Sequence, residues 1–297
     1  MGQDKQQLAK LLSFVKAVYD NPENKEFSRG IQSLFLQDIK VGKSQWSDKI
    51  DEIYEYCLCK NLRNQAEDFY RDLPKVLMNE KAKLIEDYIS MEEARRKDNF
   101  DEFGLHLYQQ LEAIVNTLAN DEKLSEVVAK MMDQPAKIST YEMVKVDGKF
   151  TRQYFPALSV SKRYGVPIAE LLYGKSTENE KKKSILLSEQ KAMDKLVTIV
   201  YFIRFQAKLT DAYYQSQWKD DINTFWLIYA VRNHVHRGAS MSIKQKDNYE
   251  IAIDNKSQSY LKFLSTLVSF VEGIEKAMND NNGSLLSQEL IEYAASL

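Results

Sequence analysis

Apolar residues recur at every third or fourth position along most of the chain, which is the spacing that places them on one face of an α-helix. The first such stripe covers residues 6–21, and a second candidate helix covers residues 27–39. A third helix is expected after Ser44 or Ser47, because either side chain can cap a first turn. Pro74 interrupts the pattern, since proline lacks the backbone N–H that a helix interior needs. The first quarter of the chain is therefore predicted to be helical.

The helical spacing continues through most of the remaining sequence. Residues 75–97 are expected to form a long helix with a polar face, and residues 100–118 form a strongly amphipathic segment. One long helix is then predicted over residues 184–217, a shorter one runs into Arg232, and a core helix over residues 257–278 precedes a short tail helix. These segments describe a compact bundle.

Specific roles are expected for a few residues in these segments. Asp220 or Asp221 is expected to cap the helix that reaches Arg232, and Gly238 can end that helix in a left-handed conformation. His106 lies among apolar neighbours of the amphipathic segment. A single histidine there is expected to be packed and hydrogen-bonded, not a metal ligand.

Two short stretches depart from the helical spacing. Residues 141–155 alternate between apolar and polar around Asp147-Gly148, which is the sequence signal of a type I′ hairpin turn. A second small hairpin is expected over residues 240–253, with its turn at residues 246–248. The predicted fold class is therefore all-α, a multi-helix bundle with one or two small β-hairpin insertions.

The pattern also predicts a division of the chain. Residues 1–135 are expected to form an N-terminal helical domain that senses a signal, binds a partner protein or supports a dimer. Residues 136–175 form an irregular connector with a hairpin, and residues 176–297 form a helical bundle. All five prolines lie at or before Pro167 and only ten glycines occur in 297 residues, which favours long helices.

Composition and charge exclude several classes of protein. Lys and Arg number 41 and Asp and Glu 43, so there is no basic surplus for a general nucleic-acid coat, although a local basic cleft remains compatible with this balance. The N-terminus lacks the pattern of a secretory signal, and the most apolar run, residues 196–203, is too short for a membrane span. Cys57 and Cys59 fit two structural thiols in a reducing cytoplasm.

No phosphate-binding, dinucleotide-binding, zinc-protease or hydrolase motif occurs in the sequence. We therefore expect neither a cofactor nor a metal. The stretch RNHVHR, residues 232–237, holds two of the three histidines. Imidazole exchanges protons near neutral pH, and guanidinium offers a fork of donors that suits phosphate oxygens. This pairing suits cleavage of RNA, whose own 2′-hydroxyl can attack the adjacent phosphorus without a metal ion.

The surrounding sequence YAVRNHVHRG resembles the active-site signature of the HEPN superfamily, which comprises all-helical ribonucleases of toxin–antitoxin, abortive-infection and CRISPR-associated systems. The signature is Arg, a polar residue that is commonly Asn, three to five further residues, and then His. Arg232, Asn233 and His236 are the matching positions, and HRG follows at His236 as in several branches. Only three residues separate Arg232 from His236, one fewer than in the signature, which rotates the histidine by about 100° if the helix continues. The resemblance covers residues 184–279.

The resemblance implies a function and a set of roles. Two protomers form a homodimer whose facing motifs bind single-stranded RNA, in bacterial antiviral defence or a toxin system. His236 acts as general acid or base, Arg232 holds the phosphate and Asn233 orients the site. His234 and Arg237 add RNA contacts, and cleavage leaves a 2′,3′-cyclic phosphate or its hydrolysis product.

Three other interpretations remain open. The motif can be an ordinary polar helix end, in which basic side chains complement the helix dipole. The same bundle can be a non-catalytic adaptor that binds a partner protein or RNA. Residues 158–174 resemble the tail of a Cro-like helix-turn-helix domain, which implies a DNA-binding regulator that uses Lys162 and Arg163.

Overall fold

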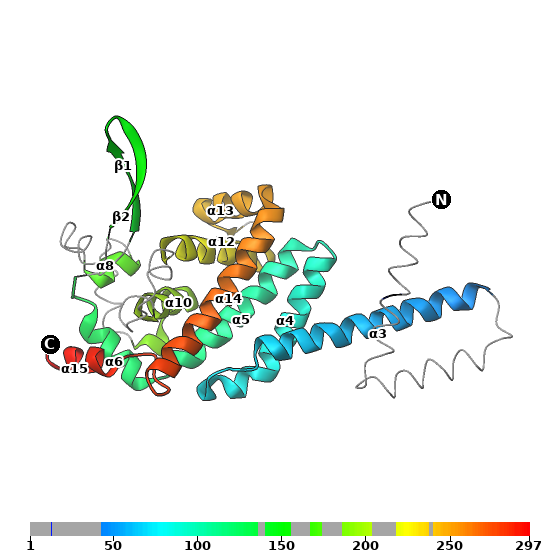
Figure 1. The fold of residues 1–297 in the computed structure, drawn as a ribbon, viewed down its shortest axis with the longest axis horizontal. Helices are drawn as coiled ribbons and strands as arrows, with labels where there is room; N and C mark the ends of the chain where they lie inside the picture. Colours follow the sequence, from blue (N-terminus) through cyan, green and yellow to red (C-terminus); the bar gives the residue numbers. More distant parts are fainter. Residues whose placement is uncertain are drawn as a thin grey trace. The chain divides into compact units, whose positions relative to one another are not determined.

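The computed structural model describes residue 13 and residues 43–135, 140–155, 167–173, 186–203, 218–237 and 240–297. Helices make up most of these residues (Figure 1), which confirms the predicted all-α class with a small β insertion. The chain divides into two compact units, residues 1–65 and residues 66–297. The predicted boundaries at residues 135 and 175 do not coincide with this division.

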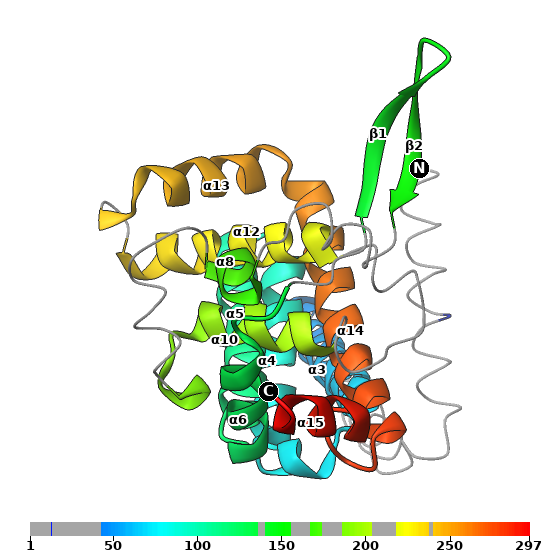
Figure 2. The ribbon, with the colours of Figure 1, turned by 90° about the vertical axis from the view of Figure 1, so that its left-hand side faces the viewer.

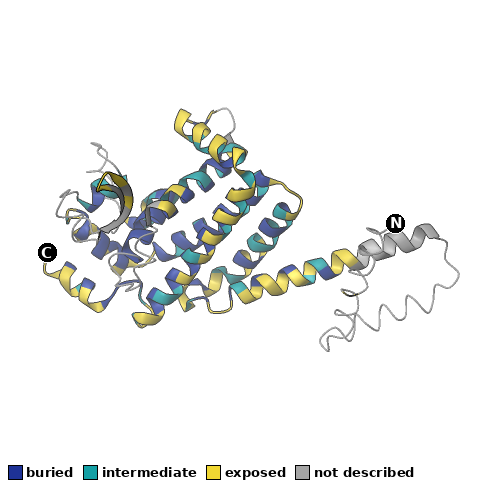
Figure 3. Ribbon diagram, turned by 45° about the horizontal axis from the view of Figure 1, so that its top comes forward, coloured by how far each residue is buried: buried dark blue, intermediate teal, exposed yellow. Residues whose placement is uncertain are grey.

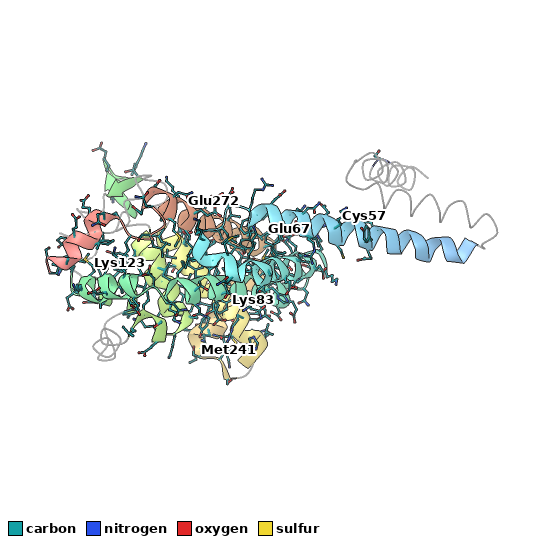
Figure 4. All side chains as sticks on the ribbon, turned by 90° about the horizontal axis from the view of Figure 1, so that it is seen from below. Cys57, Glu67, Lys83, Lys123, Met241 and Glu272 are labelled. Carbon is teal, nitrogen blue, oxygen red and sulfur yellow. The ribbon has the colours of Figure 1, made fainter. Side chains whose placement is uncertain are left out.

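Helix α3 runs from Lys43 to Phe69 and passes through the boundary between the units. Ser44 and Ser47 both lie inside it, so the prediction that one of them caps the helix is wrong. Cys57, labelled in Figure 4, is buried, whereas Cys59 is exposed, and both are free thiols. Burial raises the pKa of the Cys57 thiol. The helices predicted over residues 6–21 and 27–39 lie outside the described ranges.

The helix predicted over residues 75–97 is two elements. Pro74 precedes the 3-10 helix η2, Lys75–Glu80, and α4 follows as Lys81–Arg96. The turn after α4 contains Asp98 in a left-handed conformation, with φ of 56°. The Nζ atom of Lys256 donates to the Asp98 carbonyl at 2.8 Å, which holds this turn in place.

Helix α5, Phe100–Leu118, has the bounds that its apolar spacing predicted. The side chain of Asn99 caps it by accepting a hydrogen bond from the Glu102 N–H. Helix α5 contacts α4 and also α10, Ala192–Tyr201, α12, Trp218–Arg237, and α14, Lys256–Asp280. Figure 3 shows buried residues along the lengths of these helices. Helices from both predicted domains therefore share one core.

His106 on α5 is packed and hydrogen-bonded, as predicted. Its Nδ1 atom lies 2.9 Å from Gln109 Oε1 and 3.7 Å from Asp87 Oδ1, and its Nε2 atom lies 3.6 Å from Glu102 Oε2. The Asp87 carboxylate is the main cause of a raised His106 pKa, with burial acting in the opposite direction.

The raised pKa of His106 predicts a pH-dependent stability. Its contribution is complete below the unfolded pKa of about 6.5 and is lost as the pH rises through the higher folded pKa. We expect the free energy of unfolding to fall more between about pH 6 and about pH 8.5 in the wild type than in His106→Gln. Urea unfolding at both pH values measures this difference, and equal slopes for the two proteins would contradict it.

The predicted type I′ hairpin is confirmed. Strand β1, Thr140–Val146, pairs antiparallel with β2, Lys149–Phe155, and Val146 lies opposite Lys149. The two turn residues Asp147 and Gly148 have φ angles of 49° and 79°. Positive φ at both central positions is what a type I′ turn requires.

The second predicted hairpin is wrong, because residues 243–254 form the helix α13, Ile243–Asp254. Ser242 Oγ accepts a hydrogen bond from the Gln245 N–H at 3.3 Å, and Gln245 Oε1 accepts one from the Ser242 N–H at 3.0 Å. This reciprocal capping box starts a helix. The turn-forming residues 246–248 therefore lie inside a helix that begins at this capping box.

The segments before the motif also differ from the prediction. Within residues 184–217, the 3-10 helix η3, Leu187–Glu189, precedes α10, and Lys191 between them has an extended backbone, so the helix starts eight residues later than expected. Helix α12 starts at Trp218 and includes Asp220 and Asp221 in its first turn, so neither residue is its cap.

The last core helix and the tail helix are confirmed. Helix α14 contributes buried residues over its whole length to the core. The tail helix α15, Gln288–Ala295, packs against α6, Glu122–Met131, and the two lie together near the C-terminus in Figures 1 and 2. Among the described residues, none of the helices combines the length and the apolar character that a membrane span requires.

Candidate active site

The motif lies in the last two turns of α12, which remains helical through Arg237. Arg232 and His236 are four residues apart, so they are separated by about 40° around the helix axis and share one face. Because α12 stays helical through the motif, the rotation of His236 expected from the short spacing is present. The His236 imidazole therefore lies one helical turn after the Arg232 guanidinium.

Arg232 is half-buried and lies against an aromatic ring of α5. Its guanidinium carbon is 5.6 Å from the centre of the Tyr108 ring, and its Nη1 atom donates to Asn233 Oδ1 at 3.1 Å. Tyr108 in turn contacts Tyr229 of α12, with 5.5 Å between ring centres. A cation over a tyrosine face is attracted by the ring quadrupole. The guanidinium is thus held in a defined position.

Asn233 is fully buried, with 0% of its surface exposed. Its Oδ1 atom accepts from Arg232, while its Nδ2 atom has no hydrogen-bond partner among the described residues. A buried donor without a partner is costly to the folded state. Asn233 therefore contacts the Arg232 side chain from a buried position, and the orienting role predicted for it remains a prediction.

His234 and His236 lie on different faces of α12, because two residues correspond to about 200° of rotation. His236 is exposed. His234 stacks on Tyr249 of α13, with 3.8 Å between ring centres and 15° between planes, and its Nδ1 atom lies 3.4 Å from Asp101 Oδ2 of α5. The Tyr249 hydroxyl donates to Asp101 Oδ1 at 3.1 Å. His236 is therefore exposed to solvent, whereas His234 contacts residues of α13 and α5.

The pKa of Tyr249, the ring that stacks on His234, is also shifted. Burial, followed by the nearby Asp101 carboxylate, raises the pKa of Tyr249 to about 12. The phenol is therefore neutral near pH 7, and its hydroxyl can donate to Asp101. The RNA contacts predicted for His234 and Arg237 remain predictions.

Helix α5 contributes residues that the sequence did not indicate. A Cβ atom added at Gly104 would collide with Val231 Cγ1 and lie 3.0 Å from Val231 Cβ. The absence of a side chain at Gly104 therefore allows α5 and α12 to approach closely, with Asp101 and Tyr108 on either side of the contact. Helix α12 contacts both α5 and α13, and Figure 2 shows the three helices. Met241, labelled in Figure 4, lies just before α13. A glycine inside a strongly amphipathic helix was the only available signal.

The described residues give no further support to the other candidate sites, a metal site and a DNA-binding segment. They contain no group of three or more His, Cys, Asp or Glu side chains arranged to hold a metal ion. Lys162 and Arg163 of the helix-turn-helix-like segment lie outside them, and only α8, Ile168–Tyr173, and Pro167 of that segment are described. Comparison with known proteins found no match among family models, curated proteins or solved structures.

Proposed function

We propose that this protein is a HEPN-like, metal-independent endoribonuclease that acts on single-stranded RNA as a homodimer in bacterial antiviral defence or a toxin system. One observation carries the proposal. Arg232 and His236 share a face of α12, with the guanidinium held against Tyr108 and the imidazole exposed. A fixed cation beside an accessible proton-transfer group is what cleavage of RNA by its own 2′-hydroxyl requires.

The reaction follows from these two groups. The 2′-oxygen forms a bond to phosphorus while the bond from phosphorus to the 5′-oxygen breaks. His236 accepts the proton of the 2′-hydroxyl, and Arg232 stabilises the charge that builds on the phosphate oxygens. The leaving 5′-oxygen takes a proton from His236 of the second copy, which the homodimer supplies. The products are a 2′,3′-cyclic phosphate and a 5′-hydroxyl.

The 2′-hydroxyl provides a sharp test. Purified protein is expected to cut single-stranded RNA in EDTA and to leave 2′,3′-cyclic phosphate ends. The matched control is the same RNA with 2′-O-methyl groups, which lacks the nucleophile and should stay intact while it binds. Cleavage of the methylated strand, or failure to cut any unmodified RNA as a dimer, would contradict the proposal.

A second candidate is a non-catalytic helical adaptor that binds RNA or a partner protein. Asn233 and His234 favour it, because the first is fully buried and the second is engaged by Asp101 and Tyr249. Under this alternative, RNA remains uncut in every condition, and His236→Ala binds single-stranded RNA as the wild type does. An RNA affinity that depends on His236 together with cleavage in EDTA separates the enzyme from the adaptor.

A further inference from the structure

Arg232 is a half-buried cation whose contacts within the described part of the chain are all with neutral groups. Its guanidinium meets the Tyr108 ring and the Asn233 amide oxygen, and no described carboxylate lies within ion-pair distance. Most partly buried charges in proteins are paired with an opposite charge. An aromatic face and an amide hold a cation in place without neutralising it. Within the described residues, the groups that touch the guanidinium therefore hold it without neutralising its charge.

Tyr108 is itself held firmly. It is 2% exposed and packs against Tyr229, and the close contact of Gly104 with Val231 one turn earlier on α5 fixes the distance between the helices. Burial is the main cause of a Tyr108 pKa well above its usual range. The phenol consequently stays neutral over the working pH range and does not become a counter-ion for Arg232.

We propose that Tyr108 is a positioning residue, which holds the Arg232 guanidinium uncompensated so that it binds a phosphate of the RNA backbone. This inference rests on the proposed function and adds α5 to the site, although α5 lies more than 110 residues before the motif. Tyr108 does not contact the reacting atoms in this scheme. It acts through Arg232, and a ring at this position, with or without its hydroxyl, is sufficient.

Two substitutions at Tyr108 separate the ring from the hydroxyl. Tyr108→Phe keeps the aromatic face and is expected to retain kcat/KM within about twofold, whereas Tyr108→Leu is expected to lower it roughly 5- to 30-fold, the range of a partly desolvated cation–π contact. In an Arg232→Lys background, Tyr108→Leu should add little, because the effect passes through the guanidinium. Denaturant unfolding checks the fold, and Tyr108→Met replaces the leucine variant if that variant is unfolded.

A measurement without RNA distinguishes this inference from the proposed function. The Nε–H resonance of Arg232, assigned by its loss in Arg232→Lys, should show the ring-current shift of the tyrosine face in wild type and Tyr108→Phe but not in Tyr108→Leu. If the wild type cuts no RNA, the proposed function fails and this resonance still decides whether Tyr108 holds Arg232. An unchanged resonance in Tyr108→Leu, or a changed resonance with unchanged cleavage, would overturn the positioning role.

Discussion

Gly104→Ala is expected to destabilise the protein by about 1–3 kcal/mol, the usual cost of forcing extra atoms into a packed core. The sign is informative, because alanine in a helix interior normally stabilises it by about 1 kcal/mol relative to glycine. At Gly104 the added Cβ would collide with Val231 Cγ1, so the Val231 side chain or the packing of α5 on α12 must shift. Equilibrium unfolding in urea measures the change.

Gly273 of α14 is the matched control. Among the described residues, a Cβ at that position would meet Ile203 Cγ2 at an ordinary 3.7 Å and nothing closer. Gly273→Ala is therefore expected to leave stability unchanged or to raise it by up to about 1 kcal/mol. In the double variant Gly104→Ala with Val231→Ala, the loss should be smaller than the sum of the single losses, because the colliding methyl groups are gone. Equal effects at Gly104 and Gly273 would contradict the close helix contact.

Local patterns predicted the elements whose signals agree with one another. Helix α5 combines a regular apolar stripe with an Asn cap, and the hairpin has the Asp-Gly pair that a type I′ turn needs. Predictions were wrong where two local signals competed. In α13 the turn-forming residues 246–248 indicated a hairpin, whereas Ser242 and Gln245 form a capping box that starts a helix. Asp220 and Asp221 are acidic residues, which are favourable both as a helix cap and within the first turn of a helix, and in α12 they lie in the first turn.

The candidate site was predictable only in part. The order of Arg232, Asn233 and His236 is a local pattern, and it located the last turns of α12 in advance. The contributions of Asp101, Gly104 and Tyr108 come from a helix far away in the sequence, and such contacts follow from packing and not from local spacing. Asp101, together with Tyr249 of α13, also surrounds His234, whereas His236 is exposed.

This difference predicts that substitutions at the two histidines have opposite effects. His236→Ala removes an exposed side chain, so the free energy of unfolding should stay within about 0.5 kcal/mol of the wild type. RNA cleavage should fall by about 10²- to 10⁴-fold, the usual contribution of a general acid or base. His234→Ala removes the stack on Tyr249 and the contact with Asp101, and should cost about 0.5–1.5 kcal/mol of stability.

Unfolding in urea and cleavage of single-stranded RNA, measured on the same preparations, compare the two variants. Asp101→Asn is the matched control for His234, because it keeps the shape of the side chain and removes the charge that faces Nδ1. It should cost less stability than His234→Ala, because the stack on Tyr249 remains, and should resemble the wild type in cleavage. If His234→Ala instead abolished cleavage while His236→Ala retained it, the proton-transfer group would lie on the α13 side of α12. The alignment of Arg232 with His236 on one helix face would then have no catalytic meaning.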